Sequence, residues 1–99
     1  RSIEYNDNRR SLYGAMQGKC EITGRIWEVG EIHCHQKIPI TNGGTEKYDN
    51  LLMIAEDVHI LLHETNSETI RKYLRNLCLD SKQRQKLNKY RQILGLAEI

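Results

Sequence analysis

The sequence has no phenylalanine, one proline (Pro39) and one tryptophan (Trp27) among its 99 residues. Hydrophobic residues still make up 38% of the chain, so a buried core has to be built mainly from aliphatic side chains and tyrosine. There is no apolar run long enough to cross a membrane and no recognisable signal peptide. We therefore expect one small domain with a modest core and no membrane partner.

Cysteine is scarce and poorly spaced for cross-linking or for metal binding. Cys20, Cys34 and Cys78 are odd in number and far apart, and no Cys-x-x-Cys pair occurs, which argues against a disulfide framework and a thiolate zinc site. Thr23 stands where a zinc knuckle would have its second cysteine, so Cys20 is expected to be packed as a free thiol. We expect a reducing compartment, either the bacterial cytoplasm or an organelle, and no secretion.

Charge is nearly balanced overall but unevenly placed. The formal net charge is +2. Positive side chains concentrate in the last third of the chain, at Arg71, Lys72, Arg75, Lys82, Arg84, Lys86, Lys89 and Arg91. This distribution is typical of a solvated helix face, and also of a surface that contacts nucleic-acid phosphates.

A helix is predicted in the first 18 residues, with Asn6, Asp7 and Asn8 as candidate N-caps. Residues 20–24 and 25–29 are predicted to form short strands separated by a turn at Gly24.

The centre of the chain alternates in a way that favours a strand over residues 31–35, followed by a long loop and a second apolar strand over 51–54. Asp57 is a suitable N-cap for the helix that follows. Two strands and a helix in this order form a ββα arrangement.

The last third is predicted to be helical. An amphipathic stripe of helical spacing is formed by Ile70, Tyr73, Leu74, Leu77 and Cys78. Residues 65–68 and 80–83 resemble capping boxes, and Gly95 is expected to end the final helix.

These elements predict an α+β fold in which an N-terminal helix and two C-terminal amphipathic helices flank the ββα unit. We expect a single domain over residues 1–99, with a core at 19–64 and a helical C-terminal extension at 65–99. Because the chain begins with Arg1 and not with methionine, we interpret it as a domain excised from a larger protein.

All four histidines lie between residues 33 and 63. In a strand His33 and His35 share one face, and in a helix His59 and His63 lie one turn apart on one face. His35, His59 and His63 are therefore candidate ligands of a divalent metal. Three imidazoles would leave coordination positions open for water and a phosphate oxygen, as hydrolysis of a phosphodiester requires.

Several segments around these histidines match a known pattern. The segments at residues 35–39, 43–44, 49–51 and 59–63 resemble the HNH endonucleases, also called ββα-metal or His-Me finger nucleases. The flanking segments at residues 5–13, 18–24 and 68–96 are similar to the C-terminal part of group II intron-encoded reverse transcriptase/maturase proteins. The resemblance covers nearly the whole chain.

The resemblance implies a function and a set of roles. It implies a DNA endonuclease that nicks one strand of double-stranded DNA to support intron retrohoming, with intron RNA as a partner through the parent protein. His35, His59 and His63 match the metal ligands, and Asn50 matches the asparagine that orders the loop and orients the base. Catalysis in this family can run on Mg²⁺ or Mn²⁺, whereas three imidazoles also suit Zn²⁺ or Ni²⁺.

Gln36 falls where the family has its general-base histidine. A glutamine amide cannot take a proton from water near neutral pH, although it can hydrogen-bond. Three interpretations stay open: a weak nuclease that relies on the metal alone, a histidine deliberately replaced by Gln36, or a register shifted by one residue, with His35 as the base and His33 as a ligand. We favour Gln36 at the base position.

Two other functions stay open as well. One is a catalytically idle, metal-stabilised module that binds nucleic acid. The other is an RNA-binding maturase appendage without a role on DNA.

Overall fold

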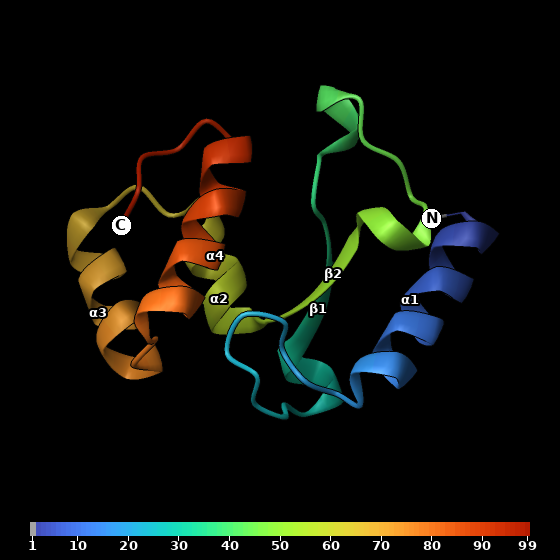
Figure 1. Ribbon diagram of the computed structural model, residues 1–99, viewed down its shortest axis with the longest axis horizontal. Coiled ribbons are helices and arrows are strands. Elements are labelled where there is room, and N and C mark those ends of the chain that lie inside the picture. Colours follow the sequence, from blue (N-terminus) through green and yellow to red (C-terminus); the bar gives the residue numbers. More distant parts are fainter. Residues whose placement is uncertain (1) are drawn as a thin grey trace.

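Two short antiparallel strands run through the middle of the molecule, with helices on either side (Figure 1). The structure is a computed structural model that describes residues 2–99. It is a small α+β domain whose described residues form four α-helices and one sheet: α1 (Ile3–Met16), β1 (Ile32–Gln36), β2 (Leu51–Ala55), α2 (Glu56–His63), α3 (Ser67–Leu77) and α4 (Ser81–Ile93). In Figure 1, α1 lies on one side of the strands, and α2, α3 and α4 lie together on the other. None of these helices has the length and apolar character that crossing a bilayer requires.

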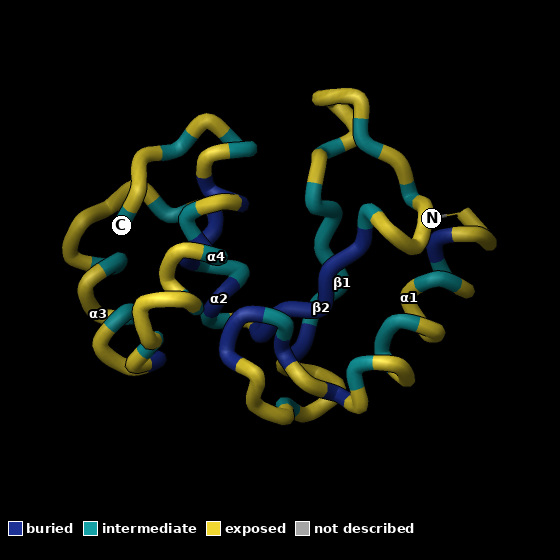
Figure 2. Tube along the Cα trace, in the orientation of Figure 1, coloured by how far each residue is buried: buried dark blue, intermediate teal, exposed yellow. Residues whose placement is uncertain are grey.

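The sheet has the strands that the sequence predicts at the centre of the chain. β1 pairs with β2 in a register that sets Ile32 opposite Ala55 and Gln36 opposite Leu51. All five residues of β2 are buried (Figure 2), whereas β1 is buried only at Ile32. An apolar run without alternation suits a strand that is covered on both faces, which agrees with the position of β2 between the two groups of helices.

β2 continues directly into α2. Ala55 is both the last residue of β2 and the N-cap of α2, and it offers no capping side chain. The prediction of Asp57 as N-cap was therefore wrong. Asp57 lies in the first turn with Glu56, where carboxylates interact favourably with the helix dipole. Burial of Val58, Leu61 and Leu62 holds this short helix in place.

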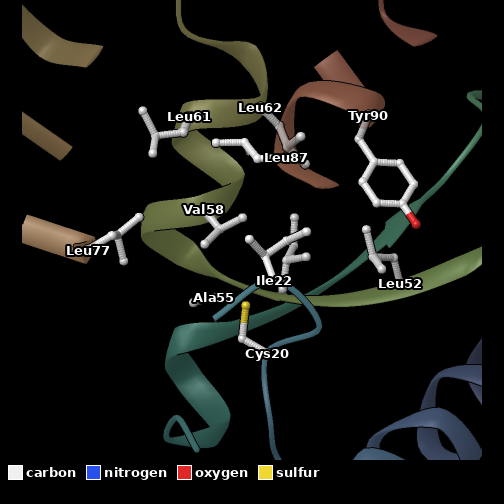
Figure 3. Close-up of a cluster of buried hydrophobic side chains, with 11 residues drawn as sticks. Cys20, Ile22, Leu52, Ala55, Val58, Leu61, Leu62, Leu77, Leu87 and Tyr90 are labelled. Atoms are coloured by element: carbon white, nitrogen blue, oxygen red, sulfur yellow. The ribbon is translucent and has the colours of Figure 1, made fainter. Parts of the chain in front are cut away.

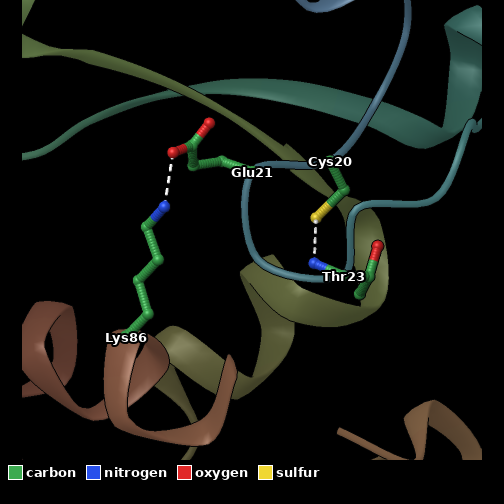
Figure 4. A network of polar contacts seen from close by, with 4 residues as sticks. All are labelled: Cys20, Glu21, Thr23 and Lys86. Carbon is green, nitrogen blue, oxygen red and sulfur yellow. Dashed lines mark hydrogen bonds and ion pairs between the residues drawn. The ribbon is translucent and has the colours of Figure 1, made fainter. Parts of the chain in front are cut away.

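The predicted strands at residues 20–24 and 25–29 do not form. Residues 21–23 make a turn, and only an isolated bridge pairs Lys19 with Ile26. The Thr23 amide donates to the Cys20 thiol (3.4 Å; Figure 4), and the Gly24 amide donates to the Cys20 carbonyl (2.8 Å). The segment folds back on itself because its amides are satisfied locally, so few remain for a ladder.

Helix caps were predicted with mixed success. Asp80 and Gln83 form the predicted capping box of α4. At α3 the cap is Asn66, which accepts from Thr69, so the predicted box at residues 65–68 was wrong by one position. At α1 the cap is Ser2, and the candidates further along the chain lie inside the helix.

The core lies between the sheet and the C-terminal helices (Figure 3). It contains Cys20, Ile22, Leu52, Ile54, Ala55, Val58, Leu61, Leu62, Leu77, Leu87 and Tyr90. Cys20 is 0% exposed, which confirms it as a packed free thiol. Leu77, Leu87 and Tyr90 come from α3 and α4, so the C-terminal helices supply part of the same core that supports the sheet. An ion pair between Lys86 and Glu21 also joins α4 to the 20–24 turn (Figure 4).

Arg91 is the exception among the basic side chains of the last third, since it is only 2% exposed. Its guanidinium donates to the carbonyls of Leu61 (2.6 Å) and Glu64 (2.9 Å) at the end of α2, and to the Ala97 carbonyl (2.8 Å). Burial lowers the pKa of Arg91 from its usual value, but guanidinium remains protonated in proteins. Backbone carbonyls at a helix C-terminus can stabilise such a cation.

Replacing Arg91 should therefore destabilise the fold. Arg91→Met leaves three buried or half-buried carbonyls without their donor, and we expect the free energy of unfolding to fall by roughly 2–4 kcal/mol. Urea denaturation measures the change. Arg71→Met, on the exposed face of α3, is the matched control and should stay within about 0.5 kcal/mol of the parent. Equal stability of the two variants would contradict the anchoring role of Arg91.

Candidate metal centre

The path of the chain through β1, β2 and α2 brings the histidines together. β1 carries His33 and His35, and α2 carries His59 and His63. The ring centroids of His35 lie 5.4 Å from His59 and 5.5 Å from His63, and those of His59 and His63 lie 4.9 Å apart. The three side chains predicted as ligands thus lie close together, although β2 separates β1 from α2 in the chain.

The geometry of this triad fits a metal ion after a small adjustment. One ligand atom from each of His35, His59 and His63 lies within 4.8 Å of the others. Nitrogen ligands of a tetrahedral zinc lie roughly 3.4 Å apart, given bonds of about 2.0–2.1 Å. The ring planes are inclined by 62° to 80°, and none of the three rings stacks on another. Rotation of the side chains could therefore bring the nitrogens onto one ion.

The protonation state of the triad suits metal binding. Burial, followed by repulsion from His59 and His63, lowers the pKa of His35 from 6.5 to about 4. Burial, followed by repulsion from His63 and His33, also lowers the pKa of His59. Both imidazoles are thus neutral near pH 7, the form whose nitrogen lone pair can bind a metal.

His33 lies beside the triad but outside it. Its ring stacks on His59 with a centroid distance of 5.4 Å and an interplanar angle of 28°. Its Nε2 atom is buried and makes no hydrogen bond to any of the residues 2–99. The sequence predicts that His33 and His35 share a strand face, and the contact that both make with His59 confirms it.

Asn50 binds the two sides of the long loop, as the sequence predicts for an ordering residue. Its Oδ1 accepts from the Ile38 amide (3.0 Å), and its Nδ2 donates to the carbonyls of Ile38 (3.0 Å) and Thr45 (2.7 Å). The Asn50 carbonyl also accepts from the Lys37 amide (2.8 Å). The loop after β1 is therefore fastened to the residue that precedes β2.

Gly44 allows this loop to close. A Cβ atom at Gly44 would lie 1.7 Å from the Ile38 carbonyl oxygen, and the Gly44 amide donates to the Pro39 carbonyl (2.9 Å). Only glycine permits so close an approach of two backbone segments. The glycine corner that the sequence singles out thus has a steric cause.

Gln36 is the last residue of β1, next to His35 in the chain. Its Nε2 atom is buried and, like His33 Nε2, has no hydrogen-bond partner among the described residues. Gln36 lines a cavity of about 760 Å³ together with His33, His35, His59 and His63. The side chain predicted at the base position therefore reaches the same cavity as the triad.

The opposite wall of this cavity was not predicted from the sequence. Tyr5, Arg9, Arg10 and Tyr13 of α1 line it. The signal was present in the chain, because Tyr5, Arg9 and Tyr13 are spaced by four residues and so share one face of a helix.

The lowered pKa of His35 generates a pH prediction for the metal-free protein. The His35 imidazole should titrate near pH 4, and NMR of its ring protons measures the midpoint. Between about pH 6.5 and pH 4 the unfolded state binds a proton that the folded state does not. The contribution of His35 to the free energy of unfolding should therefore fall as the pH drops through this window and level off below it.

His35→Asn is the control, because it removes this component of the acid sensitivity. A His35 titration midpoint near 6.5 would contradict the burial and crowding described above.

A second prediction concerns Asn50. Asn50→Ala removes three hydrogen bonds, so the Ile38 amide should lose its protection and exchange its hydrogen at least about tenfold faster. Hydrogen exchange followed by NMR measures the change. Asn42→Ala, at an exposed position of the same loop, should leave the Ile38 amide unchanged. Slow exchange in both variants would show that the loop does not depend on Asn50.

Comparison with known proteins adds no assignment. A scan against protein-family models and searches of curated proteins and of solved structures found no match to this chain. What the site can do must therefore be inferred from its own geometry: three imidazoles that meet, an asparagine that ties the loop, and a cavity in front of them.

Proposed function

We propose that this chain is a metal-dependent DNA endonuclease domain of the ββα-metal (HNH) type, which nicks one strand of a target DNA in support of group II intron retrohoming. The observation that carries the proposal is the convergence of His35, His59 and His63 on one point. The order β1, β2, α2 and the loop tied by Asn50 support it. A bound divalent ion would supply charge neutralisation on the phosphate and on the leaving oxygen.

The residues of the chain have separate roles in this proposal. His35, His59 and His63 would hold the ion, and the lowered pKa values of His35 and His59 keep the nitrogens of these two rings available near neutral pH. Asn50 holds the loop that borders the cavity. The Gln36 amide can donate and accept hydrogen bonds but accepts no proton near neutral pH, so water has to be activated without a protein base beside it. We infer a slow nuclease, because loss of a positioned acid–base group typically costs roughly 10²–10⁴-fold in rate.

Nicking of supercoiled plasmid in Mg²⁺ or Mn²⁺ tests this proposal. Gln36→His should raise the nicking rate by roughly 10²–10⁴-fold, because it supplies a base of suitable pKa at the strand end. Gln85→His, at an exposed position of α4, should leave the rate unchanged. His63→Ala should lower metal affinity, measured by calorimetry, and abolish nicking in the Gln36→His background.

Two results would contradict the assignment of roles. If Gln36→His has no effect and His35→Gln restores or shifts activity, the register is shifted by one residue and His33 becomes the ligand. Unchanged metal affinity in both His59→Ala and His63→Ala would remove the helical ligands from the proposal.

Gln36 favours a second candidate function, a catalytically idle module that keeps the metal for structure and binds nucleic acid. This second function predicts that the protein binds a metal and binds DNA in a salt-dependent manner, and that even the Gln36→His variant does not nick DNA. The intact triad favours the nuclease, because a structural site has no need for open coordination positions.

A further inference from the structure

The cavity in front of the triad has two chemically different walls. The wall on β1 and α2 carries the four histidines and Gln36, and the wall on α1 carries Arg9 and Arg10. Every residue that lines the cavity belongs to the described part of the chain, and none is an aspartate or glutamate. Two fixed positive charges therefore border a space that holds no negative charge, and such a space favours an anion.

The arginine wall is held in place by the packing of α1. Tyr5 is buried, and its hydroxyl donates to the Cys34 carbonyl of β1 (3.4 Å). Arg9 lies one turn further along the same face of α1, and Tyr13 lies one turn beyond it. This face is therefore turned toward β1 and the cavity.

Neither guanidinium of the wall is engaged elsewhere. Within residues 2–99, no hydrogen bond or ion pair is formed by the side chain of Arg9 or Arg10. Both residues are exposed. Guanidinium presents paired N–H donors that match the oxygens of phosphate.

Gln36 supplies an independent sign of a missing ligand. Its Nε2 atom is buried beside the cavity without an acceptor, and an amide NH₂ group can only donate. A buried donor in a native protein normally finds an acceptor. Gln36 Nε2 and the two guanidiniums are thus donors at one cavity, and all of them match an oxygen acceptor.

We propose that Arg9 and Arg10 of α1, together with Gln36 at the end of β1, form an anion-binding wall that holds a phosphate group in the cavity beside the histidine triad. Gln36, at the position where the family has its base, is then a positioning residue that donates to a phosphate oxygen. The identification of the anion as a phosphodiester of nucleic acid rests on the proposed function, whereas anion binding itself does not.

Titration of metal-free protein with inorganic phosphate tests the wall without any need for nuclease activity. Amide chemical shifts are followed by NMR at pH 7.5 in EDTA and at constant ionic strength, where His35 is neutral. The double variant Arg9→Gln, Arg10→Gln should weaken phosphate binding by about tenfold or more, and Gln36→Leu by severalfold. The double variant Arg71→Gln, Arg75→Gln on α3 is matched in charge and should bind phosphate as the parent does.

Equal weakening in the α1 and α3 double variants would overturn the proposal, since binding would then depend only on net charge. Unchanged binding in Gln36→Leu would remove Gln36 from the wall. The single variant Arg9→Lys keeps the charge and loses the paired donors, so an intermediate affinity supports direct contact even if the double variant fails to fold.

A second arm identifies the source of the phosphate. Thymidylyl-thymidine offers a phosphodiester, and it should bind more tightly than inorganic phosphate and be weakened by the same α1 variants. If phosphate binds and the dinucleotide does not, the assignment of the wall to a phosphodiester is overturned. If both bind at the wall but no variant nicks DNA, the wall stands and the proposed nuclease function fails.

Discussion

The direct passage from β2 into α2 is the constraint on which the site depends. No residue separates the strand from the helix, because Ala55 belongs to the end of one and caps the other. The antiparallel register places Ile32 of β1 opposite Ala55, so β1 begins where α2 begins. His35 lies three residues after Ile32, and His59 lies four residues after Ala55. Because Ile32 and Ala55 are paired, the two histidines come close together. A linker of even a few flexible residues would let α2 drift from the strand.

The other end of α2 is fixed by a different interaction. Eight residues make a helix of only about two turns, which is too short to be stable alone. Three of its residues are buried in the core, and Arg91 binds its last carbonyls. α2 is thus held at its start by the chain, along its length by burial, and at its end by a buried cation. Because His59 and His63 lie on this helix, the packing of α4 contributes to the position of the metal ligands.

Sequence patterns located the parts of the site that depend on short-range spacing. The pairing of His59 with His63 at i and i+4 and the shared strand face of His33 and His35 follow from local geometry, and the structure contains both. The loop-ordering role that the family resemblance implies for Asn50 agrees with its hydrogen bonds to Ile38 and Thr45. Local rules failed where a contact from elsewhere decided the outcome. Asp57 is a good N-cap by type, yet burial of Val58 and Leu61 sets the N-cap of α2 at Ala55, two residues earlier.

The roles of Arg91 and Arg9 could not be predicted from the sequence, because they depend on contacts between elements far apart in the chain. In the chain, Arg91 is one of many basic residues in a polar helix, and nothing local distinguishes it from Arg84 or Lys89. Only the meeting of α4 with the end of α2 gives it carbonyl partners. Likewise, Arg9 becomes part of the site only because Tyr5 packs on β1 and turns that face of α1 toward the histidines.

Buried polar atoms without a hydrogen-bond partner lower the stability of the fold, and two of them lie at the cavity. A buried polar atom without a partner costs roughly 1–3 kcal/mol, and a domain of this size has about 5–15 kcal/mol of stability in total. Two such atoms, His33 Nε2 and Gln36 Nε2, lie within a few residues of the triad. The Arg91 side chain has three carbonyl partners. In contrast, His33 Nε2 and Gln36 Nε2 have no partner among the described residues, and both residues line the same cavity. A ligand that supplies an oxygen acceptor would relieve the cost at Gln36 Nε2, so binding there should stabilise the fold as well as perform chemistry.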